Sequence, residues 1–152
     1  MGIKTPEASS RAARNRMRAV RRRGTKAEID LREALASLGL SFEANRRPLP
    51  DLRREADILF PEEKVAVFVD GCFWHGCPIH GTQAKANAVF WKEKIERNKK
   101  RDADTNERLQ QAGWVVIRVW EHVDPTVAAN EIAGVIAKVK SGRLRPTVLV
   151  IE

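Results

Sequence analysis

The chain lacks any apolar run close to the roughly 20 residues that a helix needs to cross a bilayer, so no transmembrane span is predicted. Its N-terminal region has neither an apolar stretch nor a signal-cleavage site, which predicts that there is no secretory signal. We therefore expect a cytoplasmic protein, in which thiols stay reduced. Cysteine is also scarce, and in that compartment a disulfide between Cys72 and Cys77 is the weaker interpretation.

Positive charge is what the chain has in excess. Its 152 residues include 28 Lys and Arg against 20 Asp and Glu, which gives a formal net charge of +8. Such a balance favours an anionic partner, most commonly nucleic acid, and a merely soluble basic surface is the alternative. Hydrophobic residues make up 43% and charged residues 32%, which is typical of a globular protein long enough for one domain with a core.

Arginine is concentrated at the start of the chain, where residues 1–24 consist largely of Arg, Ala and Ser and end in an Arg-Arg-Arg-Gly run. This composition predicts a basic arm that becomes ordered on a phosphate backbone, and an unstructured solubilising tail is the alternative. We divide the chain into this arm, residues 1–24, and a single domain, residues 25–152.

Apolar periodicity predicts the elements of that domain. Strands 56–60 and 65–69, joined by a tight turn, are most simply an antiparallel hairpin. Residues 40–54 are expected to be irregular. The first helix buries a stripe that ends at Leu38. Helices are predicted over residues 25–38, 86–112 and 125–141, and strands over 56–60, 65–69, 114–120 and 147–151.

Three acidic residues stand out in this pattern. Glu28 completes a capping box with Thr25, which is a structural role in its own right and the better interpretation of the residue from the pattern alone. Asp57 lies just inside a buried-type strand, beside a strand that ends in Asp70. Charged groups are rarely buried without a partner or a metal. The position of Asp57 therefore indicates a functional site, and a salt bridge to an arginine is the alternative.

Four of the five Cys and His residues of the chain lie between positions 72 and 80. The fifth, His122, directly follows a strand that can lie beside strand 65–69. In that arrangement the His122 side chain can reach the cluster. Thiol and imidazole groups are typical zinc ligands. A set of four leaves His75 as a candidate general base, unless His75 is the ligand and His80 a surface residue. The predicted zinc ligands are Cys72, Cys77, His80 and His122.

Several separated motifs occur in order along the chain. They are VFVDGCFWHGC at residues 67–77, FWxxKIxxN at 90–98, RD at 101–102, GWxV at 113–116 and VWE at 119–121. Together with residues 15–20 and Glu28, these motifs resemble the very short patch repair (Vsr) endonucleases over about residues 10–122.

The resemblance implies an α/β fold of the restriction-endonuclease type, in which helices flank a mixed β-sheet and one structural zinc is bound. The implied activity is a Mg²⁺-dependent nick on the 5′ side of the thymine in a T:G mismatch, which arises when 5-methylcytosine deaminates. The implied partner is double-stranded DNA with such a mismatch, with a functional link to a cytosine-5 DNA methyltransferase and to mismatch-repair proteins. We expect a monomer that binds no membrane.

By the same resemblance, Asp57 and the backbone carbonyl of Val69 hold the catalytic Mg²⁺, His75 activates the water, and Glu28 is a supporting acid. Asp70 stands where the best-known members carry a second histidine; it can add a metal ligand or hold a water, but it is no cationic donor at neutral pH. The zinc ligands also differ from the family in type and spacing. The implied DNA-contacting residues are Phe73, Trp74, Trp91, Met17, Arg18, Arg21, Arg22 and Arg23.

Two other functions remain open from the sequence. One is a nuclease of the same fold with another purpose, such as restriction or recombination. The other is a zinc-stabilised DNA-binding module without catalysis. Asp57 and His75 argue against the second, because a pure binding module needs neither.

Overall fold

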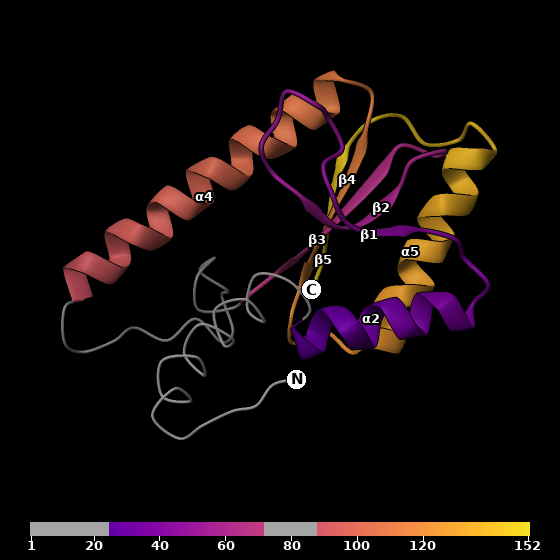
Figure 1. Cartoon of the computed structure of the whole chain (residues 1–152), viewed down its shortest axis with the longest axis horizontal. Coiled ribbons are helices and arrows are strands. Elements are labelled where there is room, and N and C mark those ends of the chain that lie inside the picture. Colours follow the sequence, from indigo (N-terminus) through magenta and orange to yellow (C-terminus); the bar gives the residue numbers. More distant parts are fainter. Residues whose placement is uncertain (1–24, 72–87) are drawn as a thin grey trace, which may run out of the picture.

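The computed structural model describes residues 25–71 and 88–152, with the backbone alone for residues 88–91. In this part of the chain, three helices flank one five-stranded mixed sheet with the strand order β1-β2-β3-β4-β5 (Figure 1). None of the described helices is long and apolar enough to cross a membrane. The elements are α2 (Lys26–Ser37), β1 (Glu43–Arg46), β2 (Ala56–Phe60), β3 (Val65–Asp70), α4 (Ala88–Gln111), β4 (Val115–Trp120), α5 (Pro125–Lys140) and β5 (Val148–Ile151).

Helix α2 begins at the predicted capping box. The Thr25 hydroxyl accepts a hydrogen bond from the Glu28 N–H at 3.3 Å and donates one to Glu28 Oε2 at 3.1 Å. The helix ends before Gly39, whose φ of +79° is the left-handed conformation that glycine adopts without strain. The predicted stripe is wrong at its end, because Leu38 is the C-cap and is 46% exposed.

Strands β2 and β3 form the predicted antiparallel hairpin, with Phe60 opposite Val65 and Ile58 opposite Val67. The prediction of an irregular segment over residues 40–54 is wrong at β1, which pairs antiparallel with β2. Three of the four β1 residues are exposed, so this edge strand is held by main-chain pairing and has no apolar pattern to predict it.

The other half of the sheet is parallel. Strand β4 pairs with β3 in a register that places Trp120 opposite Asp70, and β5 pairs with β4 on its other side. The crossovers are the helices α4 and α5, which confirm the predicted helices to within two residues. Because β3 and β4 run in the same direction, their carboxyl ends lie at one edge of the sheet, where β2 begins.

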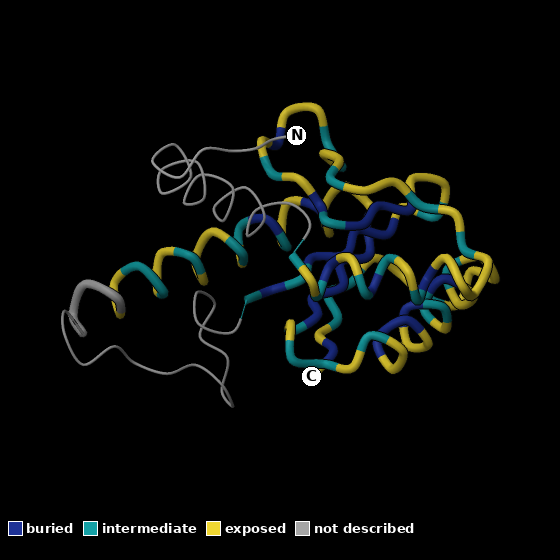
Figure 2. The backbone as a smooth tube through the Cα atoms, turned by 60° about the horizontal axis from the view of Figure 1, so that its bottom comes forward, coloured by how far each residue is buried: buried dark blue, intermediate teal, exposed yellow. Residues whose placement is uncertain are grey.

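Each face of the sheet has its own core. On one face, α2 and α5 pack their buried leucines and isoleucines against the strands, and on the other face α4 contributes Leu109. The dark tube in Figure 2 shows burial concentrated in the strands and at the C-terminal end of α4. None of residues 92–101 is buried, and this half of α4 projects beyond the sheet (Figures 1 and 2). Apolar packing therefore anchors α4 only near its end.

Candidate active site

A cavity of about 270 Å³ opens at the edge of the sheet where β2 begins and β3 ends. A larger hollow of about 460 Å³, lined mainly by residues 39–43 and 60–63, contains none of the predicted site residues. The smaller cavity brings together four of them from α2, β2 and β3, and it is therefore the candidate site. Its lining residues are Glu28, Arg54, Glu55, Asp57, Phe68, Val69, Asp70, Arg101, Asp102, Thr105 and Arg118.

Asp57 lies just before the point where β2 starts to pair with β3. The last paired residues are Ile58 and Val67, so the Val69 N–H donates to Asp57 Oδ2 instead, at 2.6 Å. Burial raises the pKa of Asp57 to about 8, and the negative charge of Glu28 adds to the rise. The charge of Asp70 raises this pKa further, whereas the Val69 hydrogen bond and the positive charge of Arg118 lower it. Asp57 is thus a buried acid whose ionised form a bound cation would stabilise.

Glu28 combines both interpretations that the sequence left open. It takes part in the capping box of α2, and its side chain is only 3% exposed and lines the cavity. Its charge acts on Asp57, as noted above. The same helix end therefore fixes Glu28 and positions it toward the site.

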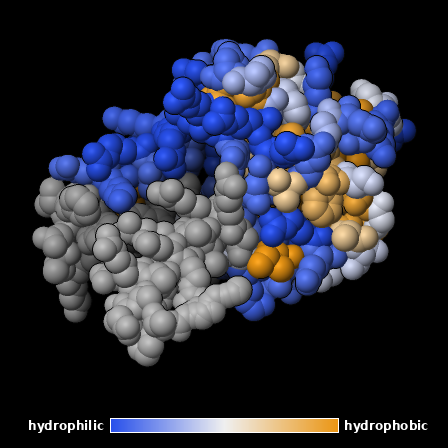
Figure 3. All heavy atoms as spheres, viewed as in Figure 1, coloured by the Kyte–Doolittle hydropathy of each residue, from blue (hydrophilic) through white to orange (hydrophobic). Residues whose placement is uncertain are grey.

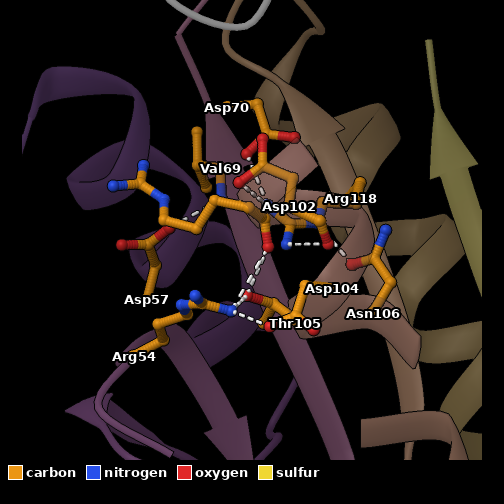
Figure 4. Close-up of polar contacts among 10 residues, drawn as sticks. Arg54, Asp57, Val69, Asp70, Asp102, Asp104, Thr105, Asn106 and Arg118 are labelled. Carbon is orange, nitrogen blue, oxygen red and sulfur yellow. Dashed lines mark hydrogen bonds and ion pairs between the residues drawn. The ribbon is translucent and has the colours of Figure 1, made fainter. Parts of the chain in front are cut away.

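Arg118 is a site residue that the sequence analysis missed. It lies in β4, is 7% exposed, and donates from Nη1 to Asp70 Oδ1 at 3.0 Å and from Nε to Asn106 Oδ1 at 2.9 Å (Figure 4). Its guanidinium also stacks over the Phe68 ring at 4.2 Å. The available signal was a lone arginine inside an apolar strand, the position of a buried charge that requires a partner.

The buried arginine Arg118 thus forms its ion pair with Asp70 and not with Asp57. Among the residues that the structure describes, Asp57 forms no ion pair, so the salt-bridge alternative for Asp57 is not supported. Asp70 instead is held by Arg118, in a pair in which both side chains are at most 10% exposed.

A second arginine fastens α4 to the cavity. Arg54 Nη1 donates to Asp104 Oδ2 at 2.8 Å, to Thr105 Oγ1 at 2.7 Å and to the Arg101 carbonyl at 3.3 Å. Figure 4 shows these contacts converging on one turn of α4. Polar contacts from Arg54 and Arg118 therefore fix the middle of α4, where apolar packing has ended.

The cavity has the opposite charge to the whole chain. Five of its lining residues are acidic and three are arginines, which gives a formal charge of −2 in a protein of +8. Across residues 25–71 and 88–152, no three acidic, His or Cys side chains are close enough to hold a metal ion alone. This still fits Mg²⁺, which commonly binds one or two carboxylates and keeps several waters.

The predicted zinc ligands are only partly within the described residues. His122 follows Trp120 by two positions, as Cys72 follows Asp70, and the pairing of Asp70 with Trp120 confirms that β4 lies beside β3. The other predicted residues of the zinc, catalytic and DNA-contacting sets fall outside the described side chains. They are Met17, Arg18, Arg21, Arg22, Arg23, Cys72, Phe73, Trp74, His75, Cys77, His80 and Trp91.

A mixed sheet that gathers carboxylates and arginines at its strand ends is consistent with an α/β protein of nuclease-like fold. The model of the family described as DNA mismatch endonuclease Vsr matches residues 6–80. Type II nicking enzyme V.NaeI of Lentzea aerocolonigenes is 48% identical over 114 residues, which cover 73% of this chain and 69% of that protein. Type II nicking enzyme V.XorIIP of Xanthomonas oryzae pv. oryzae is 38% identical over 119 residues, which cover 77% of this chain and 85% of that protein.

DNA mismatch endonuclease Vsr of Escherichia coli K12 is 37% identical over 106 residues, which cover 69% of this chain and 66% of that protein. The chain belongs to the Vsr family of DNA nicking endonucleases. It is therefore an enzyme, which excludes the alternative of a DNA-binding module without catalysis.

Proposed function

We propose that this endonuclease nicks one strand of duplex DNA on the 5′ side of the thymine in a T:G mismatch, in very short patch repair after 5-methylcytosine deaminates. The observation that carries the proposal is the meeting of Glu28, Asp57 and Asp70 in one cavity at the carboxyl end of β3, in a chain of the Vsr family. The name of the Escherichia coli relative, a DNA mismatch endonuclease, supports mismatched DNA as the substrate class.

The residues present fit a catalytic Mg²⁺. Asp57 would hold it together with the backbone carbonyl of Val69, and a cation there would offset the burial and the charge of Glu28 that raise the pKa of Asp57. When bound, Mg²⁺ would polarise the scissile phosphate and make water more acidic. Glu28 supports the same position through its negative charge.

His75 is proposed as the base that takes the proton of the attacking water. It lies five residues beyond Asp70, the last residue of β3. Asp70 would remain in the site as the carboxylate that Arg118 holds, and this buried pair links β3 to β4. A cationic group is thereby present beside Asp70, although Asp70 itself supplies none.

Cys72, Cys77, His80 and His122 would hold one structural zinc. The support is the donor set itself, which is the thiolate and imidazole type that zinc prefers, and the adjacency of the two strands that precede its members. By closing the segment between residues 72 and 80, the zinc would fix the position of His75.

The DNA would lie along the basic and aromatic parts of the chain. We propose that Phe73, Trp74 and Trp91 wedge beside the mismatch, because inserted apolar side chains favour a base step that is already weakly paired. The N-terminal arm would contact the phosphates. The surface along α4 is mainly hydrophilic in the view of Figure 3, as expected of a face turned to water or to DNA.

Strand-labelled duplexes test this proposal. Wild-type protein with Mg²⁺ should nick the T-containing strand of a T:G duplex at one position, and it should leave the matched T:A and C:G duplexes intact. Chelation of divalent cations should abolish the nick. Equal nicking of matched and mismatched DNA would contradict a role in mismatch repair and favour the alternative of a nuclease with another purpose. Randomised flanks around the mismatch would define the sequence recognised.

A further inference from the structure

Three arginines line the cavity, and two of them form ion pairs within the protein. Arg54 is bound to Asp104 and Thr105, and Arg118 is bound to Asp70 and Asn106. Each of these guanidinium groups joins two elements of the fold, and this structural role sets both arginines apart from Arg101.

Arg101 differs from both. Its backbone is fixed, because its carbonyl accepts hydrogen bonds from Arg54 at 3.3 Å and from the Thr105 hydroxyl at 2.9 Å. Its side chain is exposed and lines the cavity, yet it makes no hydrogen bond or ion pair within the described parts of the chain. The backbone of Arg101 is therefore fixed, and its exposed guanidinium lies at the rim of a cluster of carboxylates.

The acidic lining of the cavity suggests a function for the positive charge of Arg101. Even without Asp57 the lining holds four carboxyl groups against three arginines, and these carboxyl groups disfavour the phosphate that must approach Asp57 to be cleaved. Arginine offers a planar fork of N–H donors that binds phosphate oxygens in a bidentate manner and stays charged at any relevant pH. A cation at the rim, free of acidic partners, offsets the repulsion and fixes the phosphate in one orientation.

We propose that Arg101 binds the DNA phosphate that is cleaved and holds it over Asp57, while Arg54 and Arg118 only support the site. This inference rests on the proposed function for the location of the reaction, and it adds the residue that binds the reacting phosphate. Arg101 is thus the substrate-facing member of the three arginines.

The first test compares Arg101→Gln with Arg97→Gln, which removes the same charge one turn earlier on the exposed surface of α4, outside the cavity. Single-turnover nicking is measured with enzyme in saturating excess over DNA. Arg101→Gln should nick about 10- to 100-fold more slowly, the range expected from losing charge-assisted hydrogen bonds. Arg97→Gln can weaken DNA binding, but with enzyme in saturating excess its nicking rate should fall far less than that of Arg101→Gln. Arg101→Lys should recover part of the rate lost in Arg101→Gln, and all melting temperatures should agree.

The second test needs no catalysis. Binding is measured without divalent cation, on duplexes whose nicked phosphate, located with wild-type enzyme, is replaced by a neutral methylphosphonate. This replacement should cost wild type and Arg97→Gln about tenfold more affinity than it costs Arg101→Gln, because only the latter already lacks the arginine–phosphate interaction. If wild type nicks elsewhere than at a T:G mismatch, the proposed function fails, and the located phosphate still tests Arg101. An unchanged nicking rate of Arg101→Gln, or equal affinity losses in all three proteins, would overturn the inference.

Discussion

The carboxyl group of Asp57 links the stability of the protein to pH. Its pKa in the folded protein is about 8, above the roughly 3.9 of an unfolded chain, so between these values the folded state binds more protons. The group therefore contributes stability in full below about pH 4, and this contribution is lost as the pH rises toward 8. A divalent cation at the site opposes the loss, because it favours the ionised form.

Asp57→Asn should remove this dependence. In metal-free buffer at pH 8 the variant should melt at least about 3 °C above wild type, which corresponds to about 1 kcal/mol for a chain of this length. The difference should shrink as the pH falls toward 4, and Mg²⁺ at pH 8 should stabilise wild type but not the variant. Melting curves across this pH range provide the measurement. Parallel curves for the two proteins would show that the Asp57 carboxyl is not strained by its surroundings.

The roles proposed for the histidines separate in a comparison of single variants. His75→Ala should fold, retain one zinc per chain and nick about 100-fold more slowly or worse, the usual scale for loss of a general base. His122→Ala should instead lose zinc and melt at a lower temperature, since zinc binding to such sites contributes on the order of 10 kcal/mol to folding. Zinc content, melting temperature and nicking rate are measured together.

His80→Ala serves as the control for this assignment. If it keeps both zinc and activity while His75→Ala loses its zinc, then His75 is the ligand and the base must be sought elsewhere. Absence of zinc from well-folded wild-type protein would remove the zinc site altogether.

Among the elements, the two helices with defined N-caps differ in what their caps touch. Asp124 caps α5 by accepting from the Thr126 and Val127 N–H groups at 2.8 and 3.2 Å, whereas Thr25 caps α2 and also contacts the cavity residue Glu28. Replacement of either by Ala should cost about 1 kcal/mol of stability. Only Thr25→Ala should also slow nicking at temperatures where both variants are folded. Equal nicking rates would mean that the cap does not position Glu28.

The elements also show what a sequence can predict. Strands with continuous apolar residues, such as β3 and β4, and helices with clear caps, such as α2 and α5, were predicted to within two residues, because burial and capping are local signals. Strand β1 was missed because it is stabilised by main-chain pairing with β2, and such pairing produces no pattern in the sequence of β1. Only a three-dimensional partner distinguishes such a segment from a loop.

The residues of the candidate site also fall into those that the sequence predicts and those that only the fold reveals. Asp57, Asp70 and Glu28 were predicted individually, and the hairpin together with the resemblance brought them near one another. Arg118 was not predicted, because its role depends on the parallel register that places β4 beside β3 and on Asn106 in a third element. A buried ion pair between residues 48 positions apart is set by the fold and not by spacing.

For the molecule as a whole, the basic arm is predicted to supply salt-dependent DNA binding. Deletion of residues 1–20 removes five of the eight Lys and Arg residues that lie between Lys4 and Arg23. For every phosphate that the arm no longer neutralises, the slope of log affinity against log salt concentration should flatten by roughly 0.9. Affinity should fall at low salt, and melting temperature should not change. A slope equal to that of the full chain would identify the arm as a solubilising tail.

The parallel pairing of β3 with β4 also leads us to expect an order in which the site forms during folding. The hairpin joins residues as close as Phe60 and Val65, whereas the pair of Asp70 and Arg118 closes a loop of 48 residues. By loop-closure entropy alone the second step is disfavoured by roughly 2 kcal/mol relative to the first. Contacts of long sequence separation slow folding, so we expect a newly made chain to bring Asp57 beside Val69 early and to complete its cavity last. The nuclease is therefore inactive until the sheet has closed.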